Sequence, residues 1–112
     1  MEITVPRSRR TSAALLHPAV DDIDLLDVLH ALSDPTRMKI TQTLRTVPEQ
    51  LCGTFVVDLA PSTLSHHFRV LREAGVIYQR QDGTRRWTSL RGDDLESRFP
   101  GLVDRIVDQY ER

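Results

Sequence analysis

The sequence predicts a mainly α-helical fold with one small β-hairpin, because an amphipathic helical segment is followed directly by two short β-rich runs. The helix falls within residues 61–77, where Leu64, Phe68 and Leu71 recur at i, i+4 and i+7. This spacing predicts a buried stripe along one side of a helix. Gly75 is a good helix-stop residue, so we expect the helix to end there.

The other side of this helix has a composition that suits DNA better than water. It carries short hydrogen-bonding side chains and cations in place of long Glu and Lys side chains: Ser62, Thr63, Ser65, His66 and Arg69. Such a face fits the major groove, where base edges present hydrogen-bond donors and acceptors. We therefore interpret residues 61–74 as a recognition helix.

Residues 76–90 contain two β-rich runs around an Asp-Gly pair, which is a strong hairpin signal. Arg80, Arg85 and Arg86 are expected to place three guanidinium groups at the tip of this hairpin. A basic hairpin alone is equally compatible with a solvated surface. Directly after a recognition helix, it predicts a winged helix-turn-helix whose wing reaches the DNA backbone or minor groove.

The distribution of charge supports this interpretation better than the total does. The 112 residues carry a formal net charge of −1. Residues 61–91, however, contain six arginines against Glu73 and Asp82, a local balance of +4, and the rest of the chain carries −5. A basic face on an acidic body is suited to binding nucleic acid with one side of the molecule.

Length and composition exclude several other classes of protein. The chain is long enough for one domain with a single core, and it has no apolar stretch near the roughly 20 residues of a membrane span. It shows no signal-peptide pattern, and a single cysteine, Cys52, cannot form an intramolecular disulfide. We expect a cytoplasmic protein that does not bind membranes.

Two helices are predicted before the recognition helix. In residues 21–32, aspartates crowd the start, and Leu25, Leu29 and Leu32 form an apolar stripe. Residues 36–46 form the second helix, preceded by a proline suited to its first position. Its buried side chains are expected to come from Met38, Ile40, Thr41 and Leu44.

Residues 51–59, between these two helices and the recognition helix, are apolar without a clear period. We expect a short supporting helix there, anchored by Phe55 and Leu59.

The two ends of the chain are predicted to differ in order. Residues 1–18 have no steady periodicity and include Arg7, Arg9 and Arg10, so we expect a flexible basic tail, with a short helix at 12–16 as an alternative that docks on a partner subunit. Residues 19–112 form the winged helix-turn-helix domain.

The last segment, residues 93–112, predicts a helix interrupted at Pro100-Gly101. Its apolar face is wider than a small domain can cover, which favours a homodimer formed through the terminal helices. The residues expected at that interface are Leu25, Leu29, Leu102, Ile106 and Tyr110.

Two segments, Leu32–Ile40 and Ser62–Gly75, are similar in order and spacing to two signatures of the ArsR/SmtB family of bacterial regulators. The resemblance covers about residues 23–91. It implies a dimeric winged-helix protein that binds an inverted-repeat operator and usually represses transcription. Carried over by position, it implies DNA contacts from Ser62, Thr63, Ser65, His66, His67, Arg69, Arg85 and Arg86. The sequence departs from the family before the recognition helix: a turn is missing, and Ala60 stands where a Ser N-cap is expected, so we expect Asp58 to cap the helix instead.

Many members of this family sense metals, but the sequence lacks their usual ligand patterns. There is one cysteine where the thiolate site needs two or three, and residues 93–112 contain no histidine. A non-standard nickel or zinc site across a dimer would have to draw on His17, His30, Cys52, Asp21, Asp22 and Asp24. We assign no metal ligand, and a small molecule, a divalent metal and a partner protein remain alternative effectors.

Two other functions compete with DNA binding as interpretations of the sequence. Catalysis is disfavoured because Ser65 and His66, consecutive on a helix, point apart and cannot share a proton, and no Gly-rich phosphate loop is present. A winged-helix module that binds protein is the alternative. Its recognition face is expected to expose apolar or acidic residues, whereas this one carries Ser, Thr, His and Arg.

Overall fold

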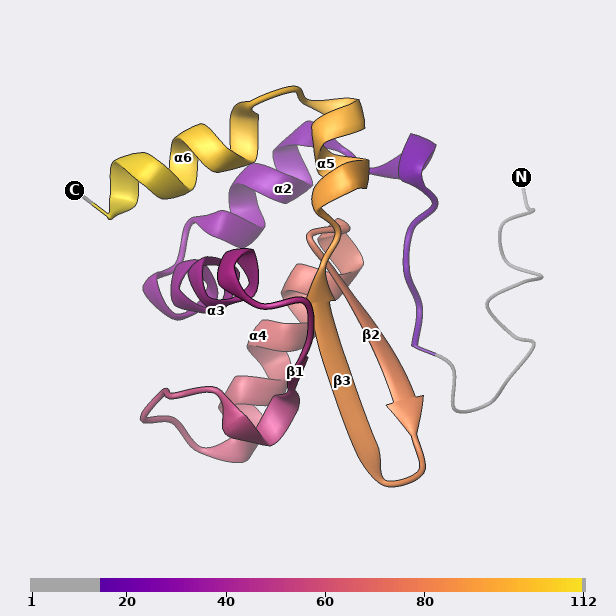
Figure 1. The fold of residues 1–112 in the computed structure, drawn as a ribbon, viewed down its shortest axis with the longest axis vertical. Helices are drawn as coiled ribbons and strands as arrows, with labels where there is room; N and C mark the ends of the chain where they lie inside the picture. Colours follow the sequence, from indigo (N-terminus) through magenta and orange to yellow (C-terminus); the bar gives the residue numbers. More distant parts are fainter. Residues whose placement is uncertain (1–14, 112) are drawn as a thin grey trace.

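A computed structural model describes residues 15–111. Over this range the chain forms five α-helices and a three-stranded antiparallel sheet (Figure 1). In chain order the elements are a 3-10 turn at Val20–Asp22, α2 (Leu25–Leu32), α3 (Pro35–Thr46), β1 (Gln50–Leu51), a 3-10 turn at Cys52–Thr54, α4 (Pro61–Ala74), β2 (Ile77–Asp82), β3 (Arg85–Leu90), α5 (Gly92–Arg98) and α6 (Leu102–Tyr110). The predicted winged helix-turn-helix fold is confirmed.

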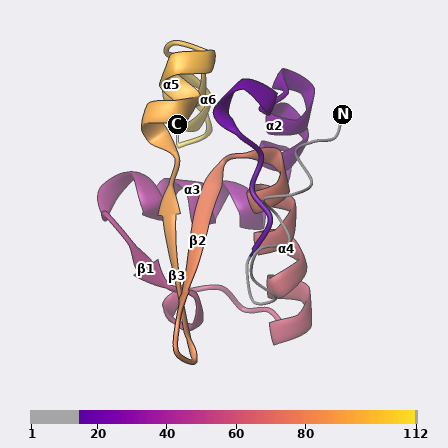
Figure 2. The same ribbon diagram turned by 90° about the vertical axis from the view of Figure 1, so that its right-hand side faces the viewer.

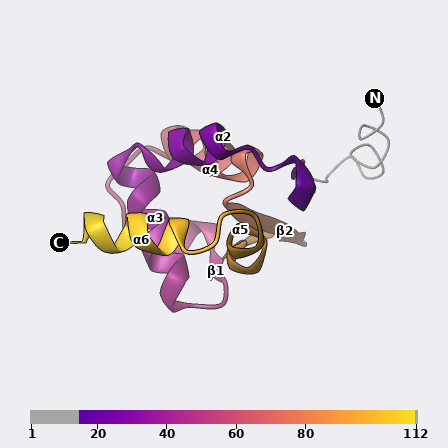
Figure 3. The ribbon, with the colours of Figure 1, turned by 90° about the horizontal axis from the view of Figure 1, so that it is seen from above.

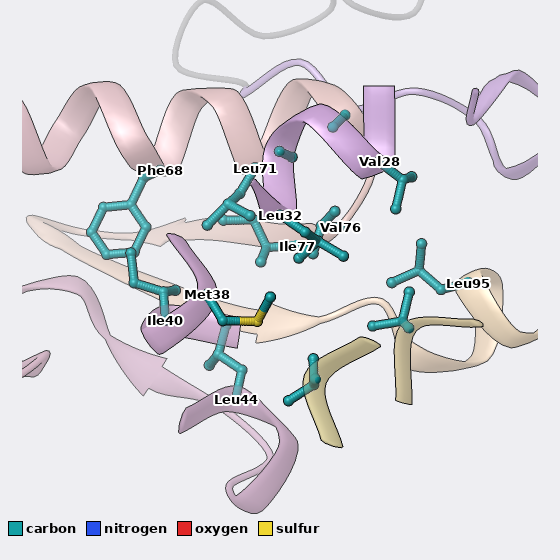
Figure 4. Close-up of a cluster of buried hydrophobic side chains, with 14 of the residues drawn as sticks. Val28, Leu32, Met38, Ile40, Leu44, Phe68, Leu71, Val76, Ile77 and Leu95 are labelled. Atoms are coloured by element: carbon teal, nitrogen blue, oxygen red, sulfur yellow. The ribbon is translucent and has the colours of Figure 1, made fainter. Parts of the chain in front are cut away.

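One hydrophobic core joins the helices to the sheet (Figure 4). Phe68 and Leu71 of α4 are buried in it, and Leu64 packs partly buried against it, as the stripe predicted. The Phe68 ring meets Phe55 edge to face, with ring centroids 5.2 Å apart. The four side chains predicted to be buried in α3 are all buried: Met38, Ile40, Thr41 and Leu44.

The helix α4 ends where the sequence predicts, at a glycine that geometry requires. Gly75 has φ +89° and donates its N–H to the Arg72 carbonyl at 3.1 Å. A Cβ on Gly75 would lie 2.7 Å from Ile23 Cγ1, so a side chain would strain both the backbone and the packing. The chain therefore turns directly from α4 into β2.

The hairpin forms the wing, with β2 and β3 close to the two β-rich runs in residues 76–90. In the register Asp82 faces Arg85, which leaves a two-residue loop whose first residue, Gly83, has φ +63°. The sheet order is β1-β3-β2, with Gln50 facing Thr88 in the short β1–β3 pairing. The strand β1 was not predicted, because two residues carry no usable periodicity.

Two predictions about helices are wrong. The helix predicted from residue 21 begins at Leu25, because Asp24 caps it by accepting the N–H groups of Leu26 and Asp27 at 3.0 and 3.2 Å. The supporting helix predicted in 51–59 is absent: β1 runs into a 3-10 turn and an irregular loop.

The loop before α4 keeps one of its two predicted anchors. Phe55 is buried, whereas Leu59 is exposed. Glycine and two adjacent valines disfavour a helix there, and the segment is too short for both a helix and a turn. Asp58 does not cap α4: the N-cap residue is Ala60, and no side chain caps this terminus.

Residues 15–18, assigned to the tail by sequence, lie against the sheet. The backbone N–H of Gln79 donates to His17 Nε2 at 2.9 Å, and the His17 ring stacks on Tyr78 with centroids 4.5 Å apart. Burial lowers the pKa of His17 to about 4. The remaining tail residues 1–14, with Arg7, Arg9 and Arg10, lie outside the described residues. So does most of the alternative helix at 12–16, and Leu15 and Leu16 are not helical.

The interruption predicted in the last helix separates α5 from α6, with Gly101 at φ +75°. Seen from above, α6 runs beside α3, and α2 lies over α4 (Figure 3). Arg45 of α3 holds α6 through Asp104 at 3.1 Å and Asp108 at 2.8 Å. Among the described residues no helix is long and apolar enough to cross a membrane.

Candidate nucleic-acid interface

The N-terminal end of α4 and the tip of the hairpin project from the same end of the molecule (Figures 1 and 2). Packing of the Phe68 side of α4 into the core leaves the opposite side facing solvent. The interface predicted from sequence is therefore one continuous end of the structure, built from a helix and the hairpin that follows it.

Five of the predicted DNA-binding residues lie exposed along α4: Ser62, Thr63, Ser65, His66 and Arg69. Within residues 15–111, their side chains form no hydrogen bond with the rest of the chain. The uncapped start of α4 also leaves its first amide groups for other acceptors. This face offers hydroxyl, imidazole, guanidinium and amide groups to an outside partner.

His67 is placed differently from its neighbours on α4. Only 12% of its side chain is exposed, and its Nδ1 lies 3.1 Å from Arg37 Nη1 and 3.8 Å from Asp34 Oδ2. Its imidazole therefore contacts α3 and the residue that caps it, rather than the exposed face. The family resemblance, carried over by position, grouped His67 with the DNA contacts, because position along the helix does not show which side chains pack against α3.

Two of the three arginines predicted at the wing tip are there. Arg85 is exposed beside the loop, and Arg86 donates from Nε to Gln81 Oε1 at 3.1 Å. The prediction for Arg80 is wrong, because it lies mid-strand opposite Trp87 and makes two 2.8 Å hydrogen bonds to the Glu49 carboxylate. These bonds hold the pKa of Glu49 below its usual value.

A buried polar cluster beneath the wing was missed by sequence reasoning. Gln79 and Thr88 are almost fully buried, and Gln79 Nε2 donates to Thr88 Oγ1 at 3.0 Å. Arg72 of α4 donates to Gln79 Oε1 at 2.6 Å, so a charged hydrogen bond ties α4 to the wing. Burial lowers the pKa of Arg72. Strand alternation would have placed Gln79 on the buried face with Ile77, which was an available signal.

The described residues do not bring the candidate metal ligands together into a binding site. His17 Nε2 accepts the backbone N–H of Gln79, and Cys52 Sγ accepts from Gln79 Nε2 at 3.3 Å and lies 3.2 Å from Thr88 Oγ1. Across residues 15–111, no three His, Cys, Asp or Glu side chains lie close enough together to hold a metal ion.

The residues predicted at the dimer interface lie at the other end of the molecule from the wing tip, on α2 and α6 (Figure 1). Leu25, Leu29 and Tyr110 are 41%, 37% and 52% exposed, and Leu102 and Ile106 are half-buried. Leu26, which sequence reasoning did not include, is 70% exposed.

A recognition-type helix with an exposed polar face, followed directly by a hairpin tipped with arginine, defines a winged helix-turn-helix protein. The chain belongs to the ArsR family of bacterial regulatory proteins, whose model matches residues 34–79. It is 34% identical over 89 residues to an uncharacterized HTH-type transcriptional regulator, YceK, of Bacillus subtilis, covering 77% of this chain and 89% of YceK. Relatives of this kind are regulators, not enzymes, so the prediction that the chain is not an enzyme is confirmed.

One further relative agrees with this assignment, and one solved structure shares the fold. A putative arsenical resistance operon repressor, ArsR, of Halobacterium salinarum is 40% identical over 75 residues, which span 61% of this chain and 57% of that protein. The crystal structure of an ArsR family transcriptional regulator shares the fold with a TM-score of 0.62 at 20% identity, covering 79% of this chain and 97% of that one. The chain is an ArsR-family transcriptional regulator, of a family that binds DNA.

Proposed function

We propose that this regulator represses transcription in the cytoplasm by binding an inverted-repeat operator as a homodimer. In each protomer α4 enters a major groove, and the wing meets the adjacent backbone or minor groove. The observation that carries the proposal is the exposed polar face of α4 at the same end as the wing tip (Figure 2).

The chemistry of α4 supports direct reading of bases. The side chains of Ser65, His66 and Arg69 are exposed and can reach base edges, with guanine the preferred partner of arginine. Ser62 and Thr63, beside the uncapped helix start, are suited to phosphate. His67 supports these contacts from the buried side, and Arg85 and Arg86 bind the backbone beside the groove.

The exposed leucines support the homodimer. Leu25 and Leu29 of α2, with Leu102, Ile106 and Tyr110 of α6, give an apolar surface at the end away from the wing tip. Pairing two copies there leaves both α4 helices free to enter successive major grooves about one helical turn apart. A dimer placed in this way across a promoter blocks polymerase, and a small molecule, a divalent metal or a partner protein releases it.

Fluorescence anisotropy tests the proposal with the full chain on DNA from upstream of its own gene and on a scrambled duplex. We expect tight binding to the upstream DNA that weakens steeply with salt, because phosphate contacts release counterions. Equally weak binding to both duplexes would contradict the proposal and favour the protein-interaction alternative. Adding nickel or zinc identifies a metal effector by a shift in affinity.

A further inference from the structure

We infer that Arg37 is a positioning residue that fixes the recognition helix α4 on α2 through His67, and that operator selectivity depends on it. The inference rests on the proposed function, because it assumes that α4 reads the operator. The Arg37 side chain lies in the core and is not part of the proposed DNA-binding surface.

Arg37 is an unusual core residue. It is 7% exposed and is the one charged residue classed as buried among those the structure describes. Its guanidinium has a partner for each nitrogen. Nε donates to the Ala31 carbonyl at 2.8 Å, Nη2 donates to the His30 carbonyl at 3.3 Å, and Nη1 lies 3.1 Å from His67 Nδ1.

These partners come from different elements. The two carbonyls belong to the last turn of α2, where helix carbonyls lack partners within the helix and favour a cation. His67 lies in the middle of α4, next to His66 and two residues before Arg69, both of which belong to the exposed face. One planar side chain from α3 thus connects the end of α2 to the part of α4 that carries the proposed base contacts.

Asp34, the N-cap residue of α3, lies beside this contact. Its carboxylate accepts the N–H groups of Thr36 and Arg37 at 2.9 and 3.1 Å, and it lies 3.8 Å from His67 Nδ1. The contact with Arg37 requires a neutral His67 with its proton on Nε2, because a guanidinium can only donate. Arg37 therefore sets a direction for the imidazole, and with it the rotation of α4 about its axis.

Stability alone does not explain a guanidinium at this position. Removing a cation from water is costly, and well-packed apolar residues in place of buried charged groups are often neutral or stabilising. Directional hydrogen bonds, unlike apolar contacts, specify one orientation of the helices. A methionine at this position fills similar space without specifying the rotation of α4.

The test compares Arg37→Met with Lys39→Met, an exposed charge-matched control on the same helix. Unfolding midpoints and affinities for operator and scrambled DNA are measured for both variants. For Arg37→Met we expect a folded protein with about tenfold weaker operator binding and scrambled-DNA binding equal to the control. An operator affinity equal to that of Lys39→Met would overturn the inference. A wild type without selectivity would instead overturn the proposed function.

A double-mutant cycle separates positioning from general loss of structure. If Arg37 acts through His67, the operator affinity of the double variant Arg37→Met/His67→Leu should be no lower than that of whichever single variant binds the operator less tightly. Additive losses would contradict the inference. Should Arg37→Met fail to fold, Arg37→Lys replaces it in the cycle. The single ammonium group of lysine cannot reach α2 and His67 together, so we expect operator affinity to fall about threefold. An unchanged selectivity would refute the role of the Arg37 guanidinium in connecting α2 to His67.

Discussion

The two ends of this molecule expose opposite kinds of surface. At the wing end, α4 presents hydroxyls, an imidazole and a guanidinium, followed by Arg85 at the hairpin tip. At the other end, α2 and α6 present apolar side chains, of which Leu26 is 70% and Tyr110 52% exposed. The first surface suits a polar, charged partner, and the second suits a matching apolar surface.

This separation explains how a chain of 112 residues with a net charge of −1 can bind DNA. Exposed positive charge lies on α4 at Arg69 and at the hairpin tip at Arg85, whereas Arg80 and Arg91 are paired with Glu49 and Asp94. Away from the wing end, Arg45 likewise pairs with Asp104 and Asp108 of α6. Substitutions at each end should therefore have separable effects on assembly and on base recognition.

The largest effect is expected from breaking the apolar end. Leu29→Asp places a charge where two copies are proposed to meet, so the protein should become monomeric and operator affinity should fall about 100-fold as the second half-site is lost. Analytical ultracentrifugation gives the mass. Val56→Asp is the matched control, because Val56 is apolar and 82% exposed in the loop before α4. A Leu29→Asp protein that keeps the mass of a dimer would refute the interface.

Next in size is the loss of a base contact. Arg69→Ala should cost about 1–3 kcal/mol of operator binding and relax the preference for the operator over scrambled DNA. Anisotropy with both duplexes measures the two affinities. If both fall equally, Arg69 binds phosphate only, and the α4 face does not read sequence through it.

A smaller effect is expected at the wing. Arg85→Ala should weaken binding to operator and scrambled DNA alike by about 1 kcal/mol, and should reduce the slope of log K against log salt by about one. Arg80→Ala is the comparison, because its guanidinium is paired with Glu49 and should contribute less to DNA binding. A larger loss for Arg80 than for Arg85 would reverse the proposed order of contacts.

The smallest effect concerns the segment beside the wing. The pKa of His17 is about 4 in the fold and about 6.5 when unfolded, so the folded state binds fewer protons. Its stabilising contribution is complete above pH about 6.5 and is lost as the pH falls toward about 4. His17→Gln keeps a hydrogen-bond acceptor but does not titrate. Urea unfolding measures the free energy of unfolding at the two pH values. On acidification, the wild type should lose on the order of 1 kcal/mol more of this free energy than the variant, because the ring is only half-buried. Equal losses would refute this contribution.

Local patterns in the sequence predicted the elements on which function depends. The apolar spacing in α4, the stop at Gly75 and the Asp-Gly turn were sufficient for the recognition helix and the wing. Contacts between distant residues were not accessible, because periodicity reports one element at a time. The pairing of Arg80 with Glu49 and that of Arg37 with His67, 30 residues apart, belong to this class.

The loop before α4 shows a second limit of prediction. A short supporting helix was predicted in residues 51–59, but β1 pairs with β3 there, and of the two expected anchors only Phe55 is buried. The two-residue strand β1 forms because it pairs with the edge of β3. No local pattern in the sequence predicts this pairing.

Hydroxyl-radical footprinting of the full chain on its upstream DNA tests the central claim most directly. Two recognition helices in successive major grooves predict two protected patches on one face of the duplex, related by two-fold symmetry and about 10 base pairs apart. A single patch, or protection that follows the backbone without a preferred register, would contradict a dimer that reads its operator through α4.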